Sequence, residues 1–313
     1  MKSNTISTMG PLLRARFTPL LAIAATALLA APAAVRAQTL YVGSGSQTID
    51  KVSSAGVVSL FATLPAGSNP DGLAFDSSGN LYVAISAYGQ VDKISSGGVV
   101  SLFATLPGSN PVGLAFDTSG NLYVADPTPN QISKITPGGT VSLFATLASG
   151  SYPTGLAFDG SGNLYAADQV SSQISKITSG GVVSLFATLP GGSYPIGLAF
   201  DGSGNLYTTN YYNSQISKIT PGGSVSLFAT LPGGSAPNGL AFDDSGNLYV
   251  ADNFTDQISK ITSGGVVTTF ATGISGPAFI AFAPVVPEPS TWAMLALGVG
   301  AFTALRCRRK TAD

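Results

Sequence analysis

The chain has 313 residues, a formal net charge of −1, no histidine and a single cysteine. The near-neutral total hides an asymmetry, because residues 38–286 carry six Lys and thirteen Asp, no Arg and no Glu, and so have a net charge of −7. Such an acidic body excludes the cationic face that nucleic-acid binding needs, and without cysteine it forms no disulfides.

The first 37 residues have the pattern of a secretory signal peptide. Three basic residues, Lys2, Arg14 and Arg16, precede an apolar run over residues 20–31, and the sequence V-R-A ends at Ala37. A membrane span needs about 20 apolar residues, so this run is short for one. We therefore expect signal peptidase to cleave after Ala37.

One stretch recurs through the rest of the chain. Its core, G-L-A-F-D, begins at Gly72, Gly113, Gly155, Gly197 and Gly239, with spacings of 41 or 42 residues. A period in this range is typical of solenoids, propellers and arrays of small units.

Each repeat contains four strand signals. In the third copy they cover residues 155–159, 163–168, 173–177 and 182–188, all short and rich in β-branched, aromatic and aliphatic residues. Glycine-containing turns separate the first strand from the second and the third from the fourth. Each repeat therefore predicts a four-stranded antiparallel meander.

The number of strand copies favours a closed ring. Copies of the second strand begin at Leu40, Leu81, Leu122, Leu164, Leu206 and Leu248. The first strand has five clear copies and a degenerate sixth within residues 277–283, so the chain enters on a second strand and leaves on a first strand. We predict an all-β, six-bladed β-propeller in which the strands of residues 39–62 share one sheet with a strand at 278–283. Closure of this kind protects the edges between units.

The repeated pattern P-x-G-L-A-F-D…G-N-L-Y-V-A-D…I-x-K-I resembles the NHL-repeat and gluconolactonase-like six-bladed propellers over nearly all of residues 38–286. For gluconolactonase-like enzymes, the resemblance implies a divalent metal held by carboxylate and amide side chains, with a Glu prominent. The propeller lacks Glu, and the chain lacks the His on which lyase propellers and serine hydrolases depend. These departures favour a non-catalytic protein, although the question of an enzyme stays open.

The C-terminal segment carries a second resemblance. Pro287, Glu288 and Pro289 precede an apolar run over residues 292–305 and a basic cluster over 306–310. This arrangement resembles a PEP-CTERM sorting signal and implies processing by an exosortase. It further implies a Gram-negative bacterium that makes extracellular polysaccharide, and transient inner-membrane anchoring before processing. An ordinary tail anchor is the alternative.

The sequence thus predicts a signal peptide (1–37), a propeller (38–286) and a sorting segment (287–313). We expect an exported protein of the cell envelope, the outer surface or the extracellular matrix.

Variation among the repeats gathers on one face of the predicted ring. In a four-stranded blade, the loops between the second and third strands (the 2–3 loops) and the linkers between blades lie on one face. The 1–2 and 3–4 turns, which are nearly identical copies, lie on the other. Aromatic rings beside amides suit a sugar, and the candidates are Tyr88, Tyr152, Tyr194, Tyr211, Tyr212, Asn213, Asn253 and Phe254. The alternative is that these loops vary because nothing constrains them.

Polar residues end four of the second strands: Asp126, Asp168, Asn210 and Asp252. They are candidates for a divalent metal site or for acid–base chemistry at the channel mouth. Their repetition favours the alternative of an Asx-type cap that ties the 2–3 loop to the backbone. The Asp that opens each 1–2 turn, such as Asp76, is expected to be structural and to pair with the one Lys of its blade.

Three functions remain open from the sequence. The first is a non-catalytic module that binds a glycan or another surface protein through the variable loop face. The second is a metal-dependent lactonase or hydrolase built on the four strand-end residues, and the third is a purely architectural matrix protein. The expected partners are signal peptidase, an exosortase, and extracellular polysaccharide or a surface protein. No cofactor is expected apart from the metal of the second alternative.

Overall fold

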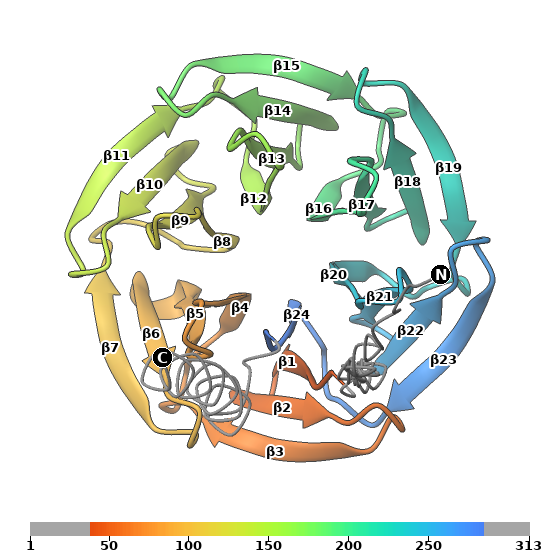
Figure 1. The fold of residues 1–313 in the computed structure, drawn as a ribbon, viewed down its shortest axis with the longest axis horizontal. Helices are drawn as coiled ribbons and strands as arrows, with labels where there is room; N and C mark the ends of the chain where they lie inside the picture. The colour runs from red at the N-terminus through yellow and green to blue at the C-terminus, as the bar shows by residue number, and fades with distance from the viewer. Residues whose placement is uncertain (1–37, 285–313) are drawn as a thin grey trace, which may run out of the picture. The chain divides into compact units, whose positions relative to one another are not determined.

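The structure is a computed structural model that describes residues 38–284, and within this range it contains six sheets of four antiparallel strands each. Figure 1 shows the sheets arranged as blades around a common axis, which confirms the predicted six-bladed propeller. The only helical element of the described range is the short 3₁₀ turn η1 (Ser86–Tyr88) in one 2–3 loop. The predicted signal peptide, with Ala37, and the predicted sorting segment, with Pro287, Glu288 and Pro289, lie outside the described residues.

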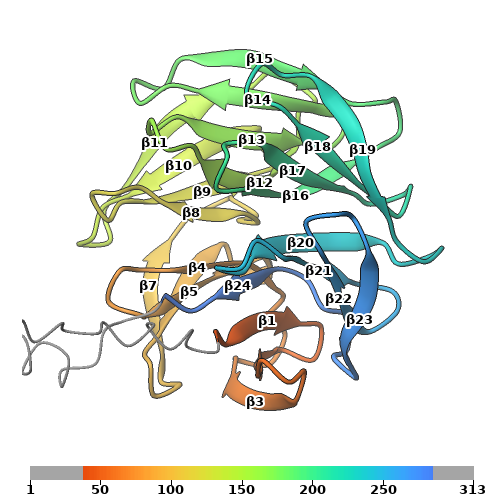
Figure 2. The ribbon, with the colours of Figure 1, turned by 45° about the vertical axis from the view of Figure 1, so that its right-hand side comes forward.

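The strands occupy equivalent places in every blade, and Figure 2 shows the same blades from an oblique direction. The inner strands are β4 (Pro70–Phe75), β8 (Leu114–Phe116), β12 (Pro153–Phe158), β16 (Pro195–Phe200), β20 (Pro237–Phe242) and β24 (Ile280–Phe282). The second strands are β1 (Leu40–Ser44), β5 (Leu81–Ile85), β9 (Leu122–Asp126), β13 (Leu164–Asp168), β17 (Leu206–Asn210) and β21 (Leu248–Asp252). The third strands are β2 (Thr48–Val52), β6 (Gln90–Ile94), β10 (Gln131–Ile135), β14 (Gln173–Ile177), β18 (Gln215–Ile219) and β22 (Gln257–Ile261). The outer strands are β3 (Val58–Thr63), β7 (Val100–Thr105), β11 (Val141–Thr146), β15 (Val183–Thr188), β19 (Val225–Thr230) and β23 (Val267–Thr272).

The ring closes as the strand count predicts. One sheet has the order β24-β1-β2-β3, so the last described strand completes the blade that the first three strands begin. β24 pairs antiparallel with β1, with Leu40 opposite Phe282 and Val42 opposite Ile280. We number this sheet blade 1; blades 2 to 6 follow along the chain and begin at β4, β8, β12, β16 and β20.

Glycine lets the inner strands approach one another closely. A Cβ atom on Gly155 would lie 2.1 Å from the carbonyl oxygen of Ile196 in the next blade, and one on Gly113 would lie 2.0 Å from that of Thr154. Gly72 donates its backbone N–H across a blade boundary to the carbonyl of Val112, at 2.7 Å. Any side chain at these positions would force the inner strands apart.

An aromatic contact joins each blade to the next. Tyr123 of β9 packs edge-on against Phe144 of its own outer strand, at 4.8 Å between ring centroids, and against Phe158 of the next inner strand, at 5.1 Å. The same pair of contacts recurs around the ring, and Tyr249 with Phe282 makes it across the closing boundary at 5.1 Å. Edge-to-face pairs stabilise beyond their area burial by about 0.5–1.5 kcal/mol.

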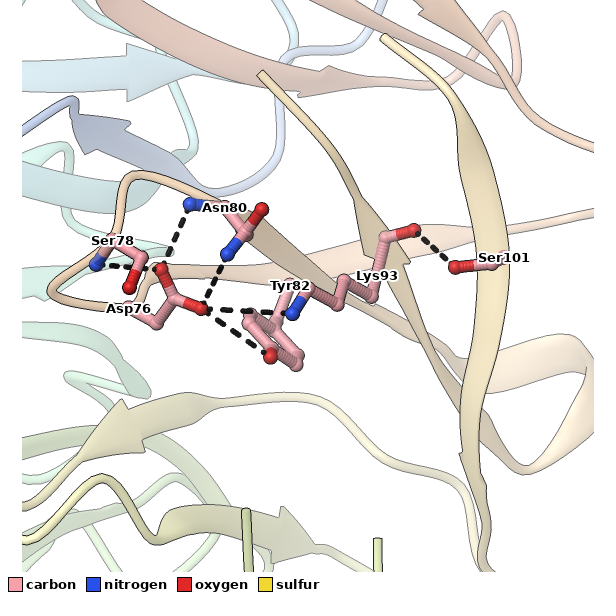
Figure 3. A network of polar contacts seen from close by, with 6 residues as sticks. All are labelled: Asp76, Ser78, Asn80, Tyr82, Lys93 and Ser101. Carbon is pink, nitrogen blue, oxygen red and sulfur yellow. Dashed lines mark hydrogen bonds and ion pairs between the residues drawn. The ribbon is translucent and has the colours of Figure 1, made fainter. Parts of the chain in front are cut away.

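The 1–2 turns are built around their first Asp, as Figure 3 shows for Asp76. Its Oδ1 accepts hydrogen bonds from the backbone N–H groups of Ser78 at 3.0 Å and Asn80 at 2.8 Å, and its Oδ2 accepts one from Asn80 Nδ2 at 2.7 Å. The Lys93 ammonium lies 3.8 Å from Oδ2 and 5.3 Å from the centre of the Tyr82 ring. The predicted structural role of this Asp and its pairing with Lys are confirmed here.

Within residues 38–284, no helix is long and apolar enough to cross a membrane.

Candidate functional site

A central cavity of about 570 Å³ opens among the inner strands, the 2–3 loops and the linkers between blades. It therefore lies on the face where the sequence variation gathers. Its lining consists of Asn69, Asp71, Ser86, Ala87, Asn110, Val112, Tyr152, Thr154, Gln169, Ile196, Tyr211, Asn238 and Phe279.

Five lining residues share one motif position, between the Pro and the Gly of the repeated P-x-G-L-A-F sequence. They are Asp71, Val112, Thr154, Ile196 and Asn238. Sequence reasoning missed them, although a signal existed: within this motif, only this position carries a different residue in every one of these five copies. In the sixth copy Phe279 replaces the glycine, and it too lines the cavity.

Asp71 is the one charged side chain of the lining. Burial raises its pKa to about 6, while a hydrogen bond with Ser86 favours the charged form. Ser86 is itself held in place, because its Oγ accepts a hydrogen bond from Asn69 Nδ2 at 3.1 Å. Across the lining, Asn238 Oδ1 has no hydrogen-bond partner in the described part of the chain. The cavity lining thus contains an acidic group that receives a neutral hydroxyl but no cation, and a buried amide oxygen without a protein donor.

Four of the predicted aromatic residues form one cluster beside the cavity. The ring of Tyr212 lies 4.5 Å from that of Tyr194 and 5.2 Å from that of Tyr211, and Tyr211 lies 5.8 Å from Phe254, between centroids. Tyr211 lines the cavity, whereas Tyr212 is 65% exposed and Phe254 is 69% exposed. The aromatic cluster (Tyr194, Tyr211, Tyr212, Phe254) therefore runs from the cavity wall to the open surface.

The other predicted binding residues occupy separate places. Tyr152 lines the cavity at a positive φ of 56°, where Asn130 Oδ1 accepts a hydrogen bond from its backbone N–H at 2.7 Å. Tyr88 donates its hydroxyl to the carbonyl of Ala66 and lies outside the lining. Asn213 is exposed and Asn253 donates to the carbonyl of Pro277 at 3.2 Å; neither lines the cavity.

The polar residues that end the second strands are buried inside their own blades. Each bonds to the serine seven residues later, on the third strand: Asp126–Ser133 at 2.6 Å, Asp168–Ser175 at 2.6 Å, Asn210–Ser217 at 2.8 Å and Asp252–Ser259 at 2.5 Å. The predicted Asx-type cap is therefore wrong, because these side chains bond to a serine of the neighbouring strand and not to the backbone of the 2–3 loop. Throughout residues 38–284, no three His, Cys, Asp or Glu side chains come together in a way that could hold a metal ion.

Blades 1 and 2 also have a buried or half-buried carboxylate between the second and third strands, but there it belongs to the third strand. These carboxylates, Asp50 and Asp92, lie at the position that serine occupies in the other blades. Asp50 receives hydrogen bonds from Thr48 and Ser44, and Asp92 from Gln90 at 2.9 Å. Every blade therefore places one carboxylate or amide between its second and third strands, which indicates a structural role.

Two family models match the sequence. Residues 33–285 match the virginiamycin B lyase family, and residues 285–310 match the PEP-CTERM protein-sorting motif. The chain belongs to the virginiamycin B lyase family. The sorting motif confirms the second resemblance and indicates an exported protein that an exosortase processes at the membrane. No curated protein matches the chain.

Solved structures of virginiamycin B lyase and of the nidogen/laminin complex share the fold. Virginiamycin B lyase from Staphylococcus aureus is 21% identical, with a TM-score of 0.61 over 76% of this chain and 85% of that chain. A catalytically inactive His-to-Ala variant of the same lyase, solved with quinupristin, is 20% identical, with a TM-score of 0.63 over 79% and 92%. A chain of the nidogen/laminin complex is 20% identical, with a TM-score of 0.70 over 79% and 98%. At these identities the likeness concerns the fold alone.

Proposed function

We propose that this exported propeller is a non-catalytic protein that binds a glycan through its 2–3 loop face. The observation that carries the proposal is the aromatic cluster, which leads from an amide-lined cavity to the exposed rings of Tyr212 and Phe254. Exposed aromatic side chains that gather beside a polar cavity are typical of recognition surfaces. Their faces can cover the C–H groups of a sugar while amides bond its hydroxyl groups.

A lyase or hydrolase activity is the weaker candidate, in spite of the family. One relative lost its catalytic activity when a histidine became alanine, and this chain has no histidine at all. The acids proposed for a metal-dependent hydrolase, Asp126, Asp168 and Asp252, are each buried and bonded to a serine of their own blade. They are therefore poorly arranged to share one ion.

We further propose that the protein works in the cell envelope, on the outer surface or in the polysaccharide matrix of a Gram-negative bacterium. Signal peptidase would cleave after Ala37, and an exosortase near Pro287, Glu288 and Pro289. The apolar run of residues 292–305 would anchor the chain in the inner membrane until that second cleavage.

The test is binding of the purified full-length protein to the host's extracellular polysaccharide, with and without a chelator. We expect binding that survives chelation and that weakens about tenfold, or about 1.4 kcal/mol, when Tyr212 and Phe254 are both replaced by alanine. Tyr88→Ala is the matched control, because Tyr88 is an exposed tyrosine outside the aromatic cluster. Binding that the double substitution leaves intact would refute the proposal. Binding lost on chelation would favour the metal-dependent alternative, and the absence of any binding would favour a protein partner or an architectural role.

A further inference from the structure

The central cavity carries a negative charge that no protein group neutralises. Asp71 is its one charged lining residue, and no lysine or arginine is among the others. The Asp71 carboxylate receives a hydrogen bond from the Ser86 hydroxyl, which is neutral and does not compensate its charge. The propeller as a whole has a net charge of −7, so the surrounding field does not supply the missing positive charge.

The rest of the lining can hold a sugar around that charge. Amide side chains from three different linkers and strands, Asn69, Asn110 and Asn238, surround the opening. Asn238 Oδ1 has no hydrogen-bond partner in the described residues. Tyr152 and Tyr211 offer ring surface. A volume of about 570 Å³ falls within the range of about 300–1,000 Å³ that is usual for small-ligand sites.

We infer that the cavity binds an amino sugar, with the sugar's free ammonium group paired to the Asp71 carboxylate. This inference rests on the proposed glycan-binding function and names its ligand class. A hydrogen-bonded pair of opposite charges satisfies both groups, since the ammonium supplies three donors and the carboxylate only accepts.

The same charge argues against other ligands. A neutral or N-acetylated sugar can donate hydrogen bonds to Asp71, but it brings no opposite charge to compensate for the water that it removes from the carboxylate. An anionic sugar would add repulsion at short range. Asp71 therefore acts as a specificity residue: it favours one ligand class and penalises the others.

The test compares two disaccharides of the same size by calorimetry at pH 7, using the full-length protein. The first is fully deacetylated chitobiose, which carries free amines, and the second is N,N′-diacetylchitobiose. We expect the deacetylated sugar to bind at least tenfold more tightly, and we expect Asp71→Asn to abolish that preference. The matched control is Asp244→Asn, which makes the same change of charge at an exposed acid in a 1–2 turn, and it should keep the preference.

The outcomes separate this inference from the proposed function. Equal binding of both disaccharides, or a preference that Asp71→Asn leaves unchanged, overturns the amino-sugar assignment while glycan binding through Tyr212 and Phe254 can still stand. The assignment is also overturned if Nα-acetyl-lysine amide binds as tightly as deacetylated chitobiose, because the site would then recognise an ammonium group regardless of the sugar. Circular dichroism and melting of the Asp71→Asn variant confirm that any loss concerns binding and not folding.

Discussion

At the scale of single residues, the buried carboxylates of the blades influence how stability depends on pH. Burial raises the pKa of Asp168 and of Asp252 to about 6, and their serine partners oppose this only in part. A group whose pKa is raised on folding binds its proton more tightly in the folded state. Its contribution to stability is therefore greatest below the unfolded value of 3.8 and declines as the pH rises to about 6.

Blade 5 contains a natural replacement for such an acid. Asn210 occupies the equivalent position and donates its Nδ2 to Ser217 Oγ at 2.8 Å, without any charge to desolvate. We therefore predict that Asp168→Asn raises the free energy of unfolding at pH 7.5 by up to about 3 kcal/mol, since each pKa unit corresponds to about 1.36 kcal/mol. At pH 4 the substitution should have little effect. Urea unfolding at both pH values measures the difference.

Asp159, in a 1–2 turn, serves as a control because folding lowers its pKa instead of raising it. At Asp159, slight burial opposes the charge, but hydrogen bonds from Asn163, Ser161 and Tyr165 outweigh it and lower the pKa. This group stabilises the fold above pH 3.8, and its contribution is lost as the pH falls through the lower folded value. Asp159→Asn should therefore destabilise the protein at pH 7.5. If Asp168→Asn also destabilised it there, the explanation based on burial would be wrong.

At the scale of the element, the inner strands depend on their glycines. Gly155 faces the carbonyl oxygen of Ile196 in the next blade, where an added Cβ would lie at 2.1 Å. Backbone atoms cannot rotate away as a flexible side chain can, so the two strands would have to separate.

We predict that Gly155→Ala lowers stability by about 1–3 kcal/mol, the range for overpacking in a close-packed interior. Gly160→Ala is the control, because nothing lies within 4 Å of the added atom and the residue has an ordinary negative φ. Thermal melting of the two variants provides the measurement. Equal melting temperatures would show that the inner strands can separate without loss.

At the scale of the whole molecule, closure of the ring is a packing event as well as a strand pairing. The core between blades 6 and 1 contains Leu40 and Val42 of β1, Ile280 of β24 and Tyr249 of β21. Removal of β24 would expose the edge of β1 and would also take Ile280 and Phe282 out of this core. Exposed edges and apolar surface of this kind promote association between chains.

We predict that a chain ending at Gly276 loses cooperative unfolding and associates, whereas a chain ending at Pro284 stays folded and keeps its melting temperature. Light scattering after size-exclusion chromatography and urea unfolding distinguish the two. A monomeric, cooperatively folding chain without β24 would show that the other five blades suffice.

The sequence by itself determined the blades, their order and the closure of the ring. The blades and their order depend on contacts that are local or one repeat away, such as the Asp76 turn or the Tyr123–Phe158 contact, and the period of 41 or 42 residues repeats such contacts in nearly every copy. Closure instead pairs the two ends of the propeller, with Leu40 opposite Phe282, and the sequence indicated it because the chain begins on a second strand and ends on a first strand. The two resemblances, to six-bladed propellers and to a sorting signal, rest on the same repeated or contiguous residues.

Only the tertiary structure decided which residues of the variable face lie together. Tyr194 and Tyr212 come from different segments and their rings are in contact, whereas Tyr88, an equally good candidate from the sequence, bonds to the carbonyl of Ala66 and is not part of the aromatic cluster. Asp71 went unnoticed because its importance depends on neighbours that five other blades bring to the axis. The variable position of the P-x-G-L-A-F motif marks five of the lining residues in the sequence, but only the closed ring brings their side chains to one cavity.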